Sequence, residues 1–498
     1  MSKPTEYTLA NALKATTNLK HGRKIQSLVI KFGFCRFTVL MTSLMNFNFK
    51  YNNFKEAIKL FDEMPKRDRD VVTWTSLIVG YAQKHCYNES LIGFRRMMME
   101  SRINEGVVPN GYAFSAALSA CSGIQAVKQG KQIHCHVLTS GLLGSNLVVY
   151  NSLLHMYWSC GCNFYAQSLF DWVAMSGDII SWNEMMLGYL QCGQEEEALK
   201  LFVLMVSAAV TKPDNYSFGI CINACGSLAS LQQGSQFHAC VFKTGFQSEL
   251  IILNALVDMY AKCGCLDSAK LVFDGTPSKD KVFWTTMITA FGKNGKVKEV
   301  LDMFEQMRNL NIKPDGITYL VVLSACSHGG LVEQGWRYFR SMTEDDLVPV
   351  SQKHYACMVD LLCRSGNLLQ AFAFIKEMPL NPGISIWSTF LGFCRMQGNI
   401  ELAQFAAEQL RKLSPEDTGK FVSLSNVYAS ERNWNETEEI RDLMNNNNVK
   451  KEPGCSWIEV NTGLHIFLTT VNSHPEMNEI LLTLKGLMTM IRKTCTFE

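Results

Sequence analysis

The stretch Asn151-Ser-Leu-Leu-His-Met-Tyr157 returns 103 residues later as Asn254-Ala-Leu-Val-Asp-Met-Tyr260. Other blocks recur at nearly the same interval, namely Ala120-Cys121, Ala224-Cys225 and Ala325-Cys326, and the tryptophans Trp74, Trp182 and Trp284. Each interval divides into three units of about 31 to 36 residues, a period typical of solenoids. We therefore predict that one supersecondary unit is stacked along the chain, and that function is spread over an extended surface.

The second copy of this stretch shows how a unit is expected to fold. From Ile251, apolar residues recur at helical spacing as far as Cys263, and Gly264 then stops the helix. A second helical stripe begins at Leu266, and Pro277 follows it. Each unit is thus predicted to be a helix, a tight turn and a helix. Strand signals are absent before the tail, and in another unit Asn367 is predicted to start its second helix with a capping box.

Composition limits the classes of function. Hydrophobic residues make up 47% of the 498 residues and charged residues only 18%, which suits a continuous core. The net charge is +2, so charge alone does not indicate a nucleic-acid partner. The 18 cysteines are expected to be reduced core residues. No apolar run is long enough to cross a membrane, and the N-terminus enters the first repeat with no visible signal or transit peptide.

The unit sequences resemble the pentatricopeptide repeat. Its P, L and S variants are matched by Val71-Val-Thr-Trp-Thr-Ser-Leu-Ile, by Gly130-Lys-Gln-Ile-His134 and by Phe61-Asp-Glu-Met-Pro-Lys-Arg-Asp68. Their alternation is similar to the PLS class of plant pentatricopeptide repeat proteins, with about eleven units over residues 6–383 in the order L, S, P. The resemblance implies an all-α fold, a right-handed α-solenoid superhelix.

The C-terminal part resembles the E-type extension of the same class. Residues 384–460 are expected to form a helical extension, and 461–498 a short E+-like tail that ends in an amphipathic helix around Ile480 to Ile491. Longer family members continue into a zinc-dependent DYW deaminase domain, which needs Cys-x-x-Cys after its His-x-Glu. Here His474-Pro-Glu476 is followed only by Cys495, so a loop is the simpler interpretation. We predict a non-enzymatic chain without a cofactor or metal.

The resemblance also assigns candidate RNA-binding residues. In the family, the fifth and last residues of a unit together read one base. The fifth residues of the first six P and S units are Thr42, Thr75, Asn151, Asn183, Asn254 and Thr285, and their closing partners are Asp70, Asn110, Asp178, Asp214, Asp280 and Asp315. The L units carry Ala10, Ser115, Gly219 and Leu320 at the fifth position, and the final S unit carries Ala356. The four L units are expected to read little, and the final S unit also departs from the pattern.

Helix capping offers another explanation for these residues, because Asn, Asp and Thr are favoured at helix N-termini. For one residue, capping and base reading are equally good interpretations. Capping alone does not explain why Thr or Asn occurs at the fifth position of the six P and S units and in none of the four L units. The family's pairing rules imply guanine for Thr–Asp, adenine for Thr–Asn, and uracil, or less well cytosine, for Asn–Asp.

The resulting hypothesis is a sequence-specific adaptor for single-stranded organellar RNA. By resemblance it acts in cytidine-to-uridine editing in the mitochondrion or chloroplast, and it recruits a deaminase-bearing or editing-factor protein through its extension. A peptide-binding helical scaffold is the alternative from another class, and RNA stabilisation or splicing without editing is a third.

Overall fold

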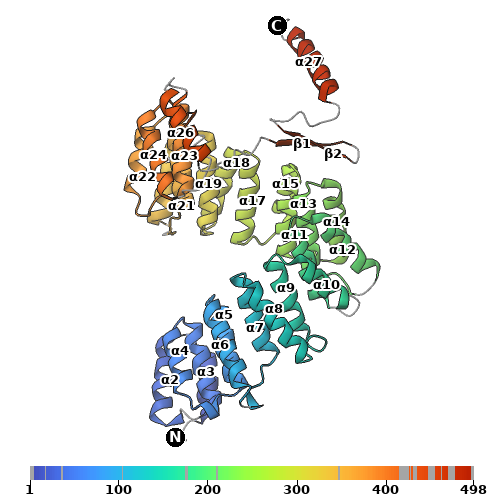
Figure 1. The fold of residues 1–498 in the computed structure, drawn as a ribbon, viewed down its shortest axis with the longest axis vertical. Coiled ribbons are helices and arrows are strands. Elements are labelled where there is room, and N and C mark those ends of the chain that lie inside the picture. Colours follow the sequence, from blue (N-terminus) through green and yellow to red (C-terminus); the bar gives the residue numbers. More distant parts are fainter. Residues whose placement is uncertain are drawn as a thin grey trace. The chain divides into compact units, whose positions relative to one another are not determined.

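The computed structural model describes residues 5–16, 18–34, 37–103, 105–173, 178–208, 211–345, 348–413, 425–426, 428–429, 434–446, 455–460, 463–468 and 477–494. The chain divides into two compact units, Met1–Ala290 and Phe291–Glu498. Both units are built from pairs of antiparallel helices (Figure 1), as the repeat period predicted. The segment His474-Pro-Glu476 and Cys495, which were compared above with a deaminase motif, lie outside the described residues.

The odd-numbered helices are the first helices of the repeating pairs. They are α1 Glu6–Ala15, α3 Thr38–Lys50, α5 Val71–Gln83, α7 Gly111–Gly123, α9 Leu147–Ser159, α11 Ile179–Gln191, α13 Asn215–Ser227, α15 Leu250–Lys262, α17 Lys281–Lys293, α19 Gly316–Gly329, α21 Gln352–Arg364 and α23 Ile384–Met396. The second helices are α2 Leu19–Lys31, α4 Phe54–Glu63, α6 Tyr87–Glu100, α8 Val127–Thr139, α10 Asn163–Val173, α12 Glu195–Ser207, α14 Leu231–Thr244, α16 Leu266–Gly275, α18 Val297–Asn309, α20 Val332–Arg340, α22 Leu368–Glu377 and α24 Ile400–Leu413.

The turn between paired helices follows the sequence prediction. α15 ends at Lys262, Gly264 adopts φ of +75°, and α16 begins at Leu266. Other units place a residue with a side chain at this left-handed position, among them Ala229 with φ of 51°. An L-residue is strained in this region because its Cβ crowds the carbonyl oxygen that follows, so these turns are less favourable than those with glycine.

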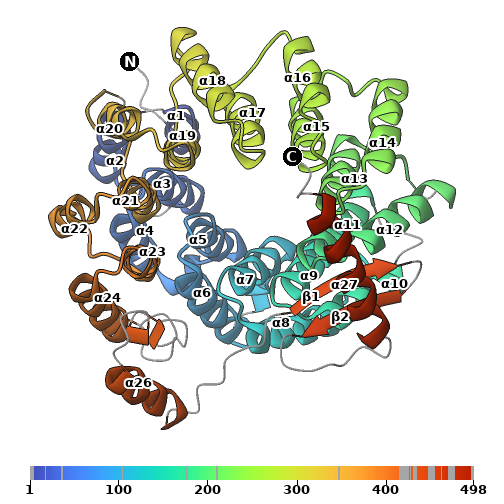
Figure 2. The same cartoon turned by 90° about the horizontal axis from the view of Figure 1, so that it is seen from above.

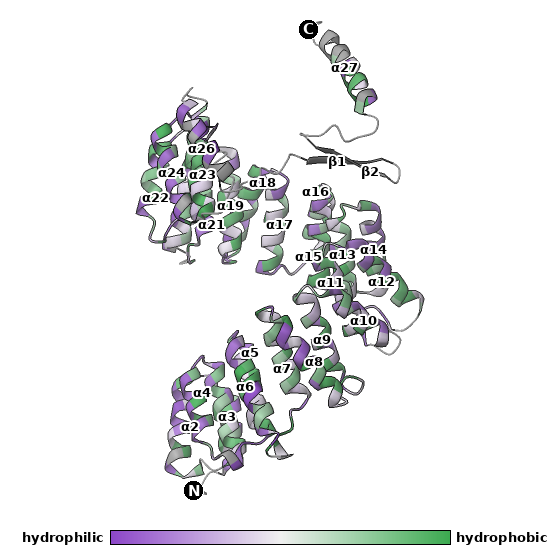
Figure 3. Cartoon of the chain, viewed as in Figure 1, coloured by the Kyte–Doolittle hydropathy of each residue, from purple (hydrophilic) through white to green (hydrophobic). Residues whose placement is uncertain are grey.

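The core forms where neighbouring units share their apolar faces. First helices pack on the first helices of the next units, as in α7 with α9 and α13 with α15. Within Met1–Ala290, α5, α7, α9 and α11 lie on the inner side of the curve and α6, α8, α10 and α12 on the outer side (Figure 2). Figure 3 shows hydrophobic and hydrophilic residues interspersed along these helices, as expected when each helix buries only one face.

Recurring aromatic pairs explain the spacing of the tryptophans. Each P-unit tryptophan meets a phenylalanine from the second helix of the preceding S unit, edge to face and with ring centroids 4.6 to 5.0 Å apart, in the pairs Phe61–Trp74, Phe170–Trp182 and Phe273–Trp284. All three tryptophans are buried. The repeat thus places a tryptophan at each of these three junctions between an S unit and the following P unit.

The cysteines whose side chains the structure describes are free thiols, as expected, but the prediction that they are core residues is wrong for Cys135, Cys192 and Cys240, which are exposed. Cys121 and Cys326 are fully buried in the first helices, and burial raises the pKa of each thiol to about 12. A thiol with such a high pKa carries almost no thiolate at neutral pH and is therefore a poor nucleophile.

The predicted capping box at Asn367 is wrong. Asn367 precedes α22, but its ψ is 59° and its side chain makes no cap hydrogen bond. Its amide nitrogen donates to Ser365 Oγ at 3.3 Å instead. A capping side chain needs an extended backbone, and the tight turn through Gly366, with φ of +85°, does not provide it.

The tail adds β structure to the otherwise helical chain. After α26 (Trp434–Asn446), strands β1 (Cys455–Val460) and β2 (Gly463–Leu468) pair as an antiparallel hairpin, with Trp457 opposite Ile466. The predicted amphipathic helix is present as α27 (Met477–Thr494) (Figure 1).

Candidate functional site

The candidate base-reading residues all occupy one position of the fold. Thr42, Thr75, Asn151, Asn183, Asn254 and Thr285 are each the fifth residue of a first helix. The L-unit residues Ala10, Ser115, Gly219 and Leu320, and Ala356 of the final S unit, occupy the fifth position of their own first helices. The equivalence assumed from the sequence therefore corresponds to one structural position.

The closing residues cap the next first helix. Asp70, Asn110, Asp178, Asp214 and Asp315 are N-caps, each accepting a hydrogen bond from a backbone N–H three residues on at 2.8 to 3.0 Å. Asp280 accepts from the Phe283 N–H at 2.8 Å in the same manner. The capping interpretation is therefore correct for the closing residues. It does not apply to the fifth residues, which lie inside the helices.

Three pairs of fifth and closing residues are in direct contact. The Thr75 hydroxyl donates to the Val71 carbonyl at 2.6 Å and also lies within hydrogen-bond distance of Asn110 Oδ1, at 3.3 Å. The Asn151 amide nitrogen donates to Asp178 Oδ1 at 3.3 Å. The amide nitrogen of Asn183 donates to Asp214 Oδ1 at 3.1 Å and lies 3.4 Å from Oδ2. Each contact joins the first helix of one unit to the N-terminus of the next, so the pairs form a series with the period of the repeat.

Two further pairs are not joined by a hydrogen bond in the described part of the chain. Thr42 is buried, and its hydroxyl donates to the Thr38 carbonyl at 2.8 Å rather than to Asp70. The Asn254 amide donates to the Leu250 carbonyl at 2.9 Å rather than to Asp280. Thr285, in the remaining P unit, also donates to its own helix, at the Lys281 carbonyl.

The L units differ in their contacts as well as in their residues. The Ser115 hydroxyl is hydrogen-bonded to that of Ser152 on the neighbouring helix α9. Gly219 has no side chain, and a methyl group built there would only touch Ile251 at 3.7 Å. Leu320 and Ala356 carry no polar group. These positions give a base little to bond with.

The structure adds a second class of candidate contact residues that the sequence argument missed. The second residue of each first helix from α1 to α19 is apolar and 44% to 70% exposed, in the series Tyr7, Val39, Val72, Tyr112, Val148, Ile180, Tyr216, Ile251, Val282 and Ile317. Residues three apart on a helix share a face, so these side chains lie beside the fifth residues. The sequence signal was an apolar residue repeated at the first turn, which looked like part of the core stripe.

An ionic contact borders one of the pairs. His155 Nδ1, one helical turn beyond Asn151, lies 3.3 Å from Glu184 Oε2, on the residue after Asn183. The hydrogen bond to Glu184 raises the pKa of His155, and partial burial lowers it by less. The negative charge of the Glu184 carboxylate raises it further. Glu184 therefore makes the imidazolium form of His155 more favourable than in a free histidine.

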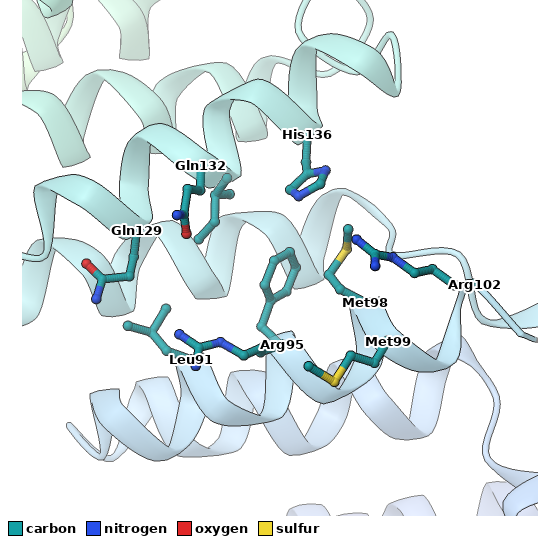
Figure 4. Close-up of a pocket in the computed structure, with 10 residues that line it drawn as sticks. Leu91, Arg95, Met98, Met99, Arg102, Gln129, Gln132 and His136 are labelled. Atoms are coloured by element: carbon teal, nitrogen blue, oxygen red, sulfur yellow. The ribbon is translucent and has the colours of Figure 1, made fainter.

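A pocket of about 180 Å³ lies apart from these residues (Figure 4). Its lining comes from α6, α8 and the residue Arg102 just after α6, and it combines Arg95, Arg102 and His136 with the thioethers of Met98 and Met99. None of the paired residues contributes to its lining. The second helices that form it lie on the outer side of the curve (Figure 2).

Among the described residues, no group of three or more His, Cys, Asp or Glu side chains is arranged to hold a metal ion. A helix with both the length and the apolar character of a membrane span is likewise not found in the described ranges.

Comparison with known families gives matches along most of the chain. The PPR repeat family matches residues 177–227 and 279–328, and the PPR repeat matches residues 39–68, 72–101, 251–276, 317–347 and 354–381. The E motif matches residues 397–459.

Curated relatives from Arabidopsis thaliana are similar over almost the same span. A mitochondrial pentatricopeptide repeat-containing protein is 38% identical over 441 residues, which cover 89% of this chain and 68% of the relative. A chloroplastic one is 35% identical over 494 residues, covering 99% of this chain and 60% of the relative. The chain thus spans roughly two thirds of the length of these relatives.

A solved structure has the same fold. The pentatricopeptide repeat protein PPR10, in complex with an 18-nt psaJ RNA element, superposes with a TM-score of 0.62 at 16% identity, covering 87% of this chain and 63% of PPR10. This similarity supports the solenoid architecture. With the repeat matches and the relatives above, it leads to one conclusion: the chain belongs to the pentatricopeptide repeat family.

Proposed function

We propose that the chain binds single-stranded RNA in a sequence-specific manner, one base for each P or S unit. The observation that carries this proposal is the series of hydrogen-bonded pairs Thr75–Asn110, Asn151–Asp178 and Asn183–Asp214. Each pair presents amide, hydroxyl or carboxyl groups that are only half-buried, and such groups can bond the edge of a base. The spacing of one pair per unit matches the one-base-per-repeat logic of such arrays.

Two other features support RNA as the ligand. The exposed apolar residues at the second positions lie next to the pairs, and apolar side chains contact the faces of unstacked bases favourably. The net charge of +2 does not itself favour RNA, because it supplies little general attraction for phosphate, so the proposal depends on contacts at particular positions. The similar PPR10 was solved with an RNA element bound.

The proposed target follows from the pairs taken in chain order. With L units as spacers, the RNA reads 5′-G-A-n-Y-Y-n-Y-G-3′, where Y is uracil in preference to cytosine and n is any base. The purified chain should bind this RNA more tightly than a version with purines and pyrimidines exchanged, in fluorescence anisotropy at one fixed salt concentration. Equal affinity for the two RNAs at that salt would contradict the proposal, because phosphate contacts alone are blind to sequence.

We further propose that the chain serves cytidine-to-uridine editing in the mitochondrion or chloroplast. The names of its relatives support only the organelle, since one is called mitochondrial and another chloroplastic. In this proposal the extension over residues 384–460, in which the E motif falls, recruits a deaminase in trans. Removal of residues from 385 onward should abolish editing of the target transcript in plants while RNA binding in vitro persists, because each repeat is stabilised by its neighbours. Editing restored by the truncated chain in a null plant would refute the recruitment role.

A further inference from the structure

Two of the Asn–Asp pairs share a third partner, a serine at the third residue of the following first helix. Ser181 Oγ lies 2.7 Å from Asn151 Oδ1 and 2.8 Å from Asp178 Oδ1. Ser217 Oγ lies 2.7 Å from Asn183 Oδ1 and 2.9 Å from Asp214 Oδ1. Both serines are fully buried, whereas the asparagines are half-buried.

This arrangement allows only one orientation of the asparagine amide. A carboxylate is a pure acceptor, so Asp178 and Asp214 must face the amide nitrogens. The amide oxygens then face the serines, which have hydroxyl protons to donate. A flipped amide would place its oxygen against the carboxylate and its nitrogen against the serine, exchanging an attractive contact for a repulsive one. Each asparagine is left with one N–H and one lone pair for another partner.

The third Asn–Asp pair lacks the serine. Phe283, a fully buried residue, occupies the equivalent position, and its ring stacks on Phe273. The Asn254 amide nitrogen is directed to the Leu250 carbonyl of its own helix, and its Oδ1 is buried with no hydrogen-bond partner in the described structure. Neither Asp280 nor a serine holds this amide, and Asp280 itself is exposed.

We propose that Ser181 and Ser217 are positioning residues that set the discrimination between uracil and cytosine by the Asn151 and Asn183 pairs. The inference rests on the proposed RNA-binding function. Uracil presents a donor at N3 and an acceptor at O4, and cytosine presents an acceptor and a donor at the equivalent places. Flipping an asparagine amide likewise exchanges the positions of its N–H donor and its carbonyl acceptor, so one orientation matches uracil and the other matches cytosine. A fixed amide therefore distinguishes the two pyrimidines, and an amide free to flip accepts both. Asn254 is held only by the Leu250 carbonyl of its own helix, so neither Asp280 nor a serine fixes its amide in the orientation that favours uracil.

The test uses the full chain and RNAs that differ only by uracil or cytosine at one base. In the target above, Asn151, Asn183 and Asn254 face the fourth, fifth and seventh bases. For the wild-type chain, the ratio of the two dissociation constants should be larger at the fourth and fifth bases than at the seventh. Loss of one net hydrogen bond corresponds to about a two- to tenfold change, so Ser181→Ala should reduce the ratio at the fourth base by that factor.

Matched variants separate positioning from stability. Ser181→Thr keeps the hydroxyl and should restore the ratio, as Thr73 and Thr318 occupy the same helix position in other units. Ser152→Ala removes a hydroxyl that touches no pair and should leave every ratio unchanged. The Asp178 cap bond to the Ser181 backbone N–H survives in all of them.

The outcomes also separate this inference from the function on which it rests. A wild-type chain that binds RNA with no base preference would overturn the proposed function. A wild-type chain that prefers uracil at the fourth base, and keeps the same preference as Ser181→Ala, would overturn the inference alone. The inference would also be overturned if the wild-type chain discriminated uracil from cytosine equally well at the fourth and seventh bases.

Discussion

The Asn183 amide nitrogen lies 3.1 Å from Asp214 Oδ1, although 31 residues separate the two in the sequence. The contact joins α11 to the N-terminal cap of α13, and so connects two successive units at the point where a base is proposed to bind. Because Asp214 also accepts the Ser217 N–H, the same carboxylate starts a helix and orients a neighbouring side chain.

Exchange of the fifth residue should change the base preference of one unit. Asn183→Thr converts an Asn–Asp pair into the Thr–Asp type already present as Thr42–Asp70, which the family rule assigns to guanine. We expect the preferred fifth base of the RNA to change from uracil to guanine, with no preference altered elsewhere, in competition binding with single-base RNA variants. The melting temperature serves as the control and should stay nearly unchanged, because residue 183 is not a cap. A general loss of binding accompanied by early melting would indicate a structural role.

Two substitutions of the closing residue Asn110 should distinguish its proposed role in base recognition from its role as a helix cap. Asn110→Asp turns a Thr–Asn pair into Thr–Asp and should shift the second base from adenine to guanine. Asp and Asn cap equally well, so stability should change by less than about 0.5 kcal/mol. Asn110→Ala should instead cost about 1 kcal/mol, because the Ala113 N–H loses its acceptor, and should also weaken discrimination at this base. Thermal melting and single-base competition on the same samples distinguish the two variants. Equal melting of Asn110→Asp and Asn110→Ala would contradict the capping role.

The half-buried histidines of the L units should make the free energy of unfolding fall in acid. His134 accepts from or donates to the Tyr157 hydroxyl at 2.7 Å, and burial lowers its pKa. A histidine whose folded pKa lies below the unfolded value of 6.5 stabilises fully above pH 6.5, and its contribution is lost as pH falls through the folded pKa. His134→Gln, which mimics Gln26 of the first L unit, should therefore lose less stability than wild type between pH 7.5 and about pH 5 in thermal melts.

His155 provides the control of opposite sign. Its pKa is raised by Glu184, so its contribution is present below pH 6.5 and is lost as pH rises through the folded value. His155→Gln should thus lose more stability than wild type on acidification. Parallel curves for both variants and wild type would show that neither imidazole titrates differently in the folded chain.

Replacement of Ala229, which adopts a left-handed turn conformation, by glycine should stabilise the fold. Its φ of 51° crowds its Cβ, and Gly264 occupies the same turn of the next unit without strain. Ala229→Gly should raise the free energy of unfolding by roughly 0.5–1 kcal/mol, because relief of strain exceeds the greater flexibility of glycine when unfolded. The reverse change, Gly264→Ala, should lower it. Chemical denaturation that gives the two variants the same sign would refute this explanation.

The helical repeat was predictable because apolar spacing and turn residues indicate the same helix boundaries. Apolar spacing from Ile251 and the stop at Gly264 predict α15 and its turn, and the structure confirms both. The capping box at Asn367 failed because residue type alone does not report the backbone angle that a cap requires.

The candidate site was predictable in position but not in detail. Alignment of the units places the first member of each pair at the fifth residue of a helix and the closing member at the start of the next, yet it does not reveal that the Asn254 amide donates to the Leu250 carbonyl rather than to Asp280. At the helix position that Ser181 and Ser217 occupy in other units, the unit after Asn254 carries Phe283, a core residue without a hydroxyl group. The exposed side chains of Val72 and Tyr112 were missed for a related reason, since an apolar residue in a helical pattern is normally assigned to the core.

The dual role of the closing residues has a consequence for how such an array can diverge. A change between Asp and Asn at Asn110 or Asp214 keeps the helix start intact, since either side chain accepts the same backbone N–H. If the closing residues read bases as proposed, such substitutions are nearly neutral for folding while they change the RNA sequence that the array prefers. Related chains can therefore change their preferred RNA by one base at a time while every intermediate sequence still folds.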